Sequence, residues 1–239
     1  MKLDCKPASV QPYSITRLSK RNLFHQIGRV VAIHFGNKQR NLPAVHFRLV
    51  VRPGVHETDF SKRQMRIPYR HLVKLEGGRL LPDLPCSYES ATRLLSAPER
   101  EACLSAFEAD VINILAGSLA EAKYVALRDD EVFNANLVYL GALKFYGGIE
   151  DMLIINEYME CLLPDCNTKR QKKLTDLFLA AYGFINDPAN WLAITTLVET
   201  IYSNPQPVFP CEEIVDFLDL HMAAQQKIIV DAPFEMLLH

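Results

Sequence analysis

Residues 16–35 carry apolar side chains at the three- and four-residue intervals of a helix that buries one face. The repeated positions are Leu18, Leu23, Phe24, Ile27, Val30, Val31 and Ile33. Gly36 and Asn37 then supply a helix stop. The pattern therefore predicts a first helix from about residue 16 to residue 35. Residues 1–15 show no such period and are predicted to form an extended arm.

The pattern changes to a β-branched alternation over Ala44–Arg52, which predicts a strand that ends before Pro53. Gln64–Ile67 is expected to pair with it as a second short strand, and Gly77-Gly78 marks another turn. This small sheet is the only β structure that the pattern predicts.

From about Ser87 onward the periodicity is helical almost to the C-terminus, with breaks at turns that contain glycine or proline. The predicted helices are Tyr88–Leu95, Ala97–Tyr124, Asp130–Phe145, Ile149–Leu162, Lys169–Tyr182, Pro188–Tyr202 and Pro210–Gln226. We therefore expect a mainly α fold with a small β-sheet (α+β). Residues 16–226 are expected to form a single domain, with the first helix and the sheet in 16–98 and the helical part in 99–226. Residues 227–239 are expected to form a tail.

Composition narrows the class of protein. The 239 residues suffice for one domain with a sizeable core, and the net charge of −2 argues against a nucleic-acid surface. No apolar run reaches the ~18–20 residues of a membrane-spanning helix. The N-terminus lacks the apolar core of a signal peptide, so a cytoplasmic location is expected. The six cysteines are scattered and are expected to be reduced thiols.

Residues 24–32 resemble a zinc-peptidase helix in which two of the three working residues are replaced. In an intact H-E-x-x-H helix, two histidines one turn apart bind the metal and the glutamate is the general base. Here His25 keeps the first ligand position, Gln26 stands at the base, and Arg29 stands at the second ligand. A neutral amide cannot take a proton from water, and guanidinium has no lone pair for zinc. Taken alone, a helical histidine such as His25 is more often a satisfied core or surface residue than a ligand.

Two later stretches share features with such a site. Leu115–Ala122 is rich in small residues that permit close helix packing, and it ends beside Glu121. The small residues are Ala116, Gly117 and Ala120. Tyr146–Leu153 places Asp151 at a helix start after a glycine turn. Taken singly, the first stretch indicates only close packing, and the second indicates only a cap or a dipole partner.

In this order the three stretches resemble the peptidase domain of FtsH-type ATP-dependent zinc proteases and their shorter bacterial relatives. That family shows H-E-A-G-H-A-V, then a Gly-x-x-Ala-Glu helix, then a glycine turn leading to an aspartate that is the third zinc ligand. The resemblance covers roughly residues 20–225 and is weakest over 53–98. It implies that His25 and Asp151 are the surviving ligand positions and that Glu121 lies nearby. The sequence contains no G-x-x-x-x-G-K-[ST] phosphate loop, so no ATPase module is expected.

The resemblance implies an inactive relative, or pseudoenzyme, that acts as a protein-binding or assembly module. No cofactor is expected for it, and its expected partner is another protein rather than a nucleic acid or a membrane. One alternative is an active zinc peptidase in which His46, His56 (followed by Glu57) or His71 supplies the missing ligand. His34 is a poor candidate because nine residues along a helix place it opposite His25. A plain helical adaptor is the remaining alternative.

Arg29 is predicted to replace the metal ion electrostatically by pairing with Asp151. A buried carboxylate without a partner costs several kcal/mol unless it is protonated or meets a cation. The planar fork of arginine suits a bidentate contact with that carboxylate. The alternative is that Arg29 turns to solvent and Asp151 only caps its helix.

Overall fold

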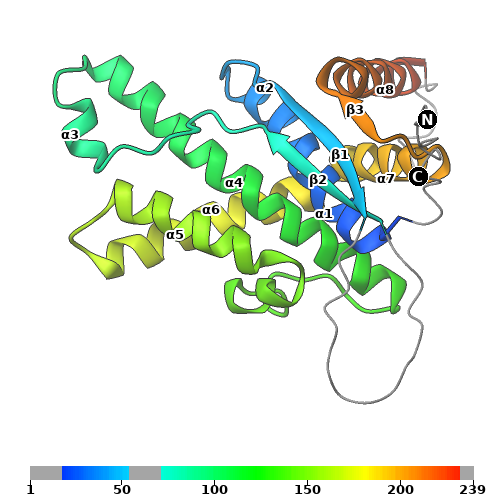
Figure 1. Cartoon of the computed structure of the whole chain (residues 1–239), viewed down its shortest axis with the longest axis horizontal. Helices are drawn as coiled ribbons and strands as arrows, with labels where there is room; N and C mark the ends of the chain where they lie inside the picture. Colours follow the sequence, from blue (N-terminus) through cyan, green and yellow to red (C-terminus); the bar gives the residue numbers. More distant parts are fainter. Residues whose placement is uncertain (1–17, 54–70, 232–239) are drawn as a thin grey trace, which may run out of the picture.

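The computed structural model describes residues 18–53 and 71–231. These residues form a mainly helical fold with one three-stranded antiparallel sheet, shown in Figure 1. The predicted fold class, mainly α with a small β-sheet, is therefore confirmed.

Helix α1 spans Lys20–Val31, and Ser19 caps it by accepting a hydrogen bond from the Asn22 N–H. The predicted stop at Gly36 is wrong, because the chain stays helical through the π-helical turn η1 (Ala32–Gly36) and the short helix α2 (Asn37–Gln39). The Asn37 side chain is buried and accepts a hydrogen bond from the Asn113 amide at 3.1 Å. A partner on another helix thus holds an asparagine that the local sequence marks as a terminator.

The sheet has the order β2-β1-β3, with β1 at Phe47–Pro53, β2 at His71–Gly77 and β3 at Val208–Pro210. Its inner face packs toward α1 and buries Phe47, Leu49, Val73, Leu75 and Phe209. The predicted first strand is present but starts three residues later, at Phe47, and includes Pro53, where it was predicted to end. The predicted partner Gln64–Ile67 lies outside the described residues. The pattern missed β2, whose inward residues are only Val73 and Leu75, and β3, which is too short to show a period.

Helix α4 (Ala97–Arg128) is the central element, and α1 packs along it. A capping box of Ser96 and Glu99 begins it, with the short helix α3 (Tyr88–Thr92) just before. Within the described residues, α4 is the one helix long and apolar enough to cross a membrane. The helix was not identified as such from the sequence, because only uninterrupted apolar runs were counted. About two thirds of its most apolar window (67%) is buried inside the fold, as in the core helix of a globular protein.

The small residues of α4 let α1 approach it very closely. A Cβ atom at Gly28 would lie 2.4 Å from the Ala120 Cβ and 2.8 Å from the Ala116 carbonyl oxygen. Atoms cannot approach so closely without a shift of one helix. The predicted close packing of Leu115–Ala122 is therefore confirmed, and α1 is the helix that uses it.

We expect Gly28→Ala to destabilise the fold by about 1–3 kcal/mol, since it overpacks this crossing. Gly183→Ala is the matched control, because Gly183 lies inside a helix and nothing lies within 4 Å of its added Cβ. That change should stabilise the fold by up to ~1 kcal/mol through helix propensity. Urea denaturation of both variants measures the difference, and equal effects would contradict the close contact.

The predicted helix Asp130–Phe145 is wrong. Asp130 takes a left-handed backbone conformation with φ of 57°, which ends the helical path after α4. The Asn134 side chain then accepts a hydrogen bond from the Asn136 N–H at 2.7 Å, a local contact that competes with helix formation. Only the 3₁₀-helix η2 (Leu140–Phe145) forms in this stretch.

The remaining predicted helices are present with shifted ends. They are α5 (Gly148–Leu162), α6 (Asn167–Asn186), α7 (Pro188–Ser203) and α8 (Cys211–Asp231). Helix α6 passes through Gly183, where a break was predicted, and α8 runs five residues beyond the predicted end at Gln226. The cysteines of the described chain are free thiols, as predicted.

Candidate functional site

The three stretches of the sequence motif meet at one buried site. His25 lies in the middle of α1, Glu121 lies late in α4, and Asp151 lies in the first turn of α5. The His25 Nε2 atom is 3.0 Å from the Asp151 Oδ2 atom, and its Nδ1 atom is 3.3 Å from the Glu121 Oε2 atom. All three side chains are at least 93% buried. One imidazole therefore bridges two buried carboxylates that are 30 residues apart in the sequence.

A glycine turn brings α5 against the imidazole. Gly147 has φ of 70°, in the left-handed region that favours glycine. A Cβ atom there would lie 2.8 Å from the His25 Nδ1 atom and 3.0 Å from the Glu121 Oε2 atom. The preceding carbonyl, that of Tyr146, lies 3.2 Å from the same Nδ1 atom. The turn thus closes over the histidine and sets the start of α5 so that Asp151 meets it.

These contacts determine the charge of His25. Burial by itself lowers the pKa of the imidazole, but the hydrogen bonds to Asp151 and Glu121 outweigh burial and raise this pKa to about 9. For Asp151, burial raises the pKa, but the hydrogen bond and the charge of His25, the charge of Arg29 and a bond from Ser118 together lower it. At neutral pH the site therefore holds an imidazolium between carboxylates.

Arg29 makes the predicted contact with Asp151, but the contact is not bidentate. Its Nη1 atom lies 3.5 Å from the Asp151 Oδ1 atom. The other carboxylate oxygen, Oδ2, accepts from His25 at 3.0 Å and from the Ser118 hydroxyl at 3.1 Å. Burial lowers the pKa of Arg29, but a guanidinium stays protonated in proteins. The predicted pairing is confirmed, and the closer cation at Asp151 is His25.

Arg21 neutralises the second carboxylate. Its guanidinium donates to the Glu121 Oε1 atom from Nε at 2.9 Å and lies 2.8 Å away through Nη2. The Nη2 group also donates to the Phe145 carbonyl at 2.8 Å, just before the glycine turn. Reasoning from the sequence missed Arg21 and Ser118. Arg21 lies one helical turn before His25. This spacing of four residues could have indicated that the two side chains share one face of the helix.

This arrangement does not fit a zinc ion. The lone pair that zinc would need on His25 Nε2 is taken by the proton shared with Asp151, and the Arg29 cation lies at the same carboxylate. Within residues 18–53 and 71–231, no three His, Cys, Asp or Glu side chains are grouped so as to hold a metal ion.

Of the proposed replacement ligands, only the side chain of His46 is described, and it lies away from the site. His46 is 73% exposed and its nearest acidic partner is Glu212, at 3.9 Å. His34 pairs with Asp219 at 2.9 Å, which agrees with its predicted place away from His25. His71 begins β2 but its side chain is outside the described part of the chain, as is the whole of His56.

Gln26, which the resemblance aligns with a catalytic base, has a structural contact. Its side-chain oxygen accepts a hydrogen bond from the Leu75 N–H at 3.1 Å, and the Asn22 side chain does the same for the Val73 N–H at 2.6 Å. Strand β2 is an edge strand, so these two donors would otherwise face outward. Helix α1 therefore blocks two donors of the sheet edge.

A cleft of about 1120 Å³ opens beside the buried ion pairs. Its walls are the face of α1 that carries His25 and Arg29, residues 72–75 of β2, and the start of α5 at Gly147, Glu150 and Asp151. The buried network therefore forms the floor of a surface cleft.

Comparisons with known proteins give no relative for this site. No protein-family model, no curated protein and no solved structure matches the chain.

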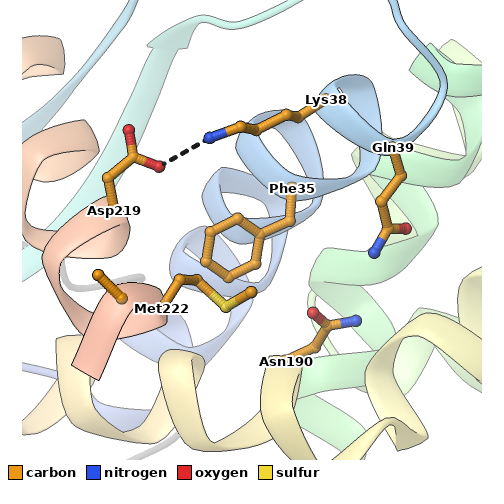
Figure 2. A pocket seen from close by; sticks show the side chains of 7 residues that line it. Phe35, Lys38, Gln39, Asn190, Asp219 and Met222 are labelled. Carbon is orange, nitrogen blue, oxygen red and sulfur yellow. Dashed lines mark hydrogen bonds and ion pairs between the residues drawn. The ribbon is translucent and has the colours of Figure 1, made fainter. Parts of the chain in front are cut away.

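A smaller hollow of about 280 Å³ lies at the C-terminal end of the continuous helical path α1–η1–α2, between α2, α7 and α8. Figure 2 shows Phe35 and Met222 side by side in it, with Lys38 reaching across to Asp219. Asp219 accepts from Lys38 at 3.2 Å as well as from His34 at 2.9 Å. These contacts hold α8 against η1 and α2, so their role is structural.

Proposed function

We propose that this chain is a catalytically inactive relative of FtsH-type zinc peptidases, and that it acts in the cytoplasm as a protein-binding or assembly module. The observation that carries the proposal is the direct His25–Asp151 hydrogen bond of 3.0 Å beside the Arg29 guanidinium. In the family these three positions would hold zinc. Here they form an ion-pair network that provides the positive charge from the protein itself.

The family part of the proposal rests on how the three stretches assemble. A histidine on one helix, the small-residue and glutamate stretch of a second, and an aspartate after a glycine turn converge on one point. Each stretch taken singly has a plain structural explanation. Their convergence in this order is what supports a peptidase-like ancestry over a plain helical adaptor.

The inactive part of the proposal rests on two replaced groups. Gln26 cannot accept a proton from water, and its amide oxygen is engaged with the Leu75 N–H. Arg29 cannot ligate a metal. The cleft of about 1120 Å³ is retained beside these groups, and a retained cleft without chemistry is suited to binding.

Purified protein is expected to hold no stoichiometric zinc after dialysis and to leave casein uncut, because a catalytic zinc site needs three protein ligands plus water. The double change Gln26→Glu with Arg29→His is expected to raise zinc binding more than activity. It rebuilds the ligand face, and glutamate can still accept from the Leu75 N–H, but the groups that orient the ligands are not rebuilt.

Plasma mass spectrometry and a casein assay on the parent, the double variant and the Gln26→Glu control test this. One mole of zinc per mole of parent protein, together with peptide hydrolysis, would contradict the proposal and favour an active peptidase with an atypical ligand set. A double variant that gains no zinc would favour the plain helical adaptor.

A further inference from the structure

The cleft differs in charge from the protein as a whole. The chain has a net charge of −2, whereas the described lining of the cleft has five cationic side chains, counting the His25 imidazole that lies between two carboxylates, against three carboxylates. The cations are Arg21, His25, Arg29, Arg52 and Lys74, and the carboxylates are Glu121, Glu150 and Asp151. A concave surface with an excess of one sign of charge concentrates ligands of the opposite sign. The excess therefore favours an anionic ligand.

The carboxylates of the floor are already neutralised from within. Glu121 is paired with Arg21 and His25, and Asp151 with His25 and Arg29. The cations of the rim are more accessible. Lys74 is exposed and makes no ion pair with a carboxylate in the described part of the chain, and Arg52 is 55% exposed with Glu76 as its partner. The third carboxylate, Glu150, is exposed at the α5 side of the cleft, so a ligand would meet positive charge at the β2 side.

The blocked edge of β2 limits how a peptide can bind. A peptide added as a further strand would need the outward N–H groups of β2. Those of Val73 and Leu75 already donate to Asn22 and Gln26. Recognition along this wall therefore depends on side chains. Those available are Arg52, Leu72 and Lys74, a mixture of cationic and apolar groups.

We propose that the cleft binds an acidic peptide segment of a partner protein, with the ligand's carboxylates paired to Arg52 and Lys74 and its apolar side chains placed against Leu72. This inference rests on the proposed function as a binding module and names the chemistry of its partner. The exposed cations Arg52 and Lys74 beside the exposed apolar Leu72 favour it. The blocked strand donors confine recognition to these side chains.

The test uses fluorescein-labelled peptides of about ten residues, a length of about 33 Å when extended. One peptide alternates glutamate and leucine, and its matched control alternates glutamine and leucine. Fluorescence anisotropy with the full chain should show tighter binding of the glutamate peptide, and raising the salt concentration should weaken it through screening.

The chain offers a matched pair of arginines. Arg48 and Arg52 both bond to Glu76 and are 57% and 55% exposed, but only Arg52 lines the cleft. Arg52→Gln and Lys74→Gln should each weaken binding of the glutamate peptide about two- to fivefold, the range of an exposed ion pair. Arg48→Gln should leave the dissociation constant unchanged.

The outcomes separate this inference from the proposed function. Equal binding of the two peptides, or equal effects of Arg48→Gln and Arg52→Gln, would overturn the acidic ligand but leave a peptide-binding module. Binding of neither peptide would count against both. Tighter binding of a single-stranded oligonucleotide than of the glutamate peptide would overturn the choice of a peptide partner.

Discussion

Asp151→Asn is expected to destabilise the fold by about 3–5 kcal/mol, the cost of removing one partner from a buried ion pair. The Asp151 side chain is only 6% exposed, and it accepts from His25 and Ser118 while contacting Arg29. Asparagine keeps the size of the side chain but removes its charge. Two buried cations, His25 and Arg29, would then lose the carboxylate that they share.

Asp219→Asn is the matched control for this prediction. Asp219 also pairs with a histidine and a second cation, His34 and Lys38, but its side chain is 47% exposed. Exposed ion pairs contribute about 0–1 kcal/mol, so this variant should be close to the parent in urea denaturation. Similar losses for the two variants would contradict the view that burial of the network determines its strength.

The single change Arg29→Ala is expected to cost less than Asp151→Asn. Reasoning from the sequence alone predicts a loss of ~3–5 kcal/mol for Arg29→Ala, since it treats Arg29 as the one partner of a buried charge. The structure corrects this, because His25 at 3.0 Å remains to balance Asp151. A double-mutant cycle between positions 29 and 151 should still give a coupling energy above ~0.5 kcal/mol.

Stability should fall as the pH rises from about 6.5 to about 9. The pKa of His25 is raised to about 9 in the folded protein, against an ordinary value of 6.5. A raised folded-state pKa contributes stability that is complete below the unfolded pKa and is lost as the pH passes the folded pKa. The shift corresponds to about 3 kcal/mol, since one pKa unit is about 1.4 kcal/mol.

Asp151 acts in the opposite direction at acid pH. Its folded pKa is lowered, so its contribution is present above the ordinary carboxyl pKa of about 3.9 and is lost as the pH falls through the folded pKa. The pKa shifts of His25 and Asp151 both arise in part from the hydrogen bond between them. Stability should therefore be greatest between about pH 4 and 6.5, where both contributions are complete.

Denaturant unfolding from about pH 6 to about pH 8, below the ordinary thiol pKa of about 8.5, measures the alkaline loss. Asp151→Asn should flatten the slope, because it removes a hydrogen bond that raises the His25 pKa. An equal slope in the parent and the variant would show that His25 is not the titrating group.

Much of the helical fold could be predicted because helix periodicity is local. Helix α1, the strand β1 and the start of α4 at Ala97 were all readable from residues next to each other. At two positions a distant contact overrode the local signal. Asn37 looked like a helix stop until Asn113 bonded to it, and β2 became a strand because it pairs with β1.

For the site, the sequence supplied the residues but not their protonation. The positions of His25, Glu121 and Asp151 were identified through the order of three motifs, and the structure brings them together. The charge of His25 depends on how deeply α4 and α5 bury it, which no local pattern contains. The same limit explains why Gln26 looked like a lost catalytic base, while its contact with the Leu75 N–H was unforeseen.

Nitrogen-15 NMR of the His25 ring at about pH 7.5, before and after addition of one equivalent of zinc, tests the central claim most directly. The account predicts protons on both ring nitrogens, since a pKa of about 9 keeps His25 charged at this pH, and no change on adding zinc. A ring that is neutral at this pH would contradict the imidazolium of a closed ion-pair network, and an Nε2 signal that shifts when zinc is added would show that the histidine is a metal ligand.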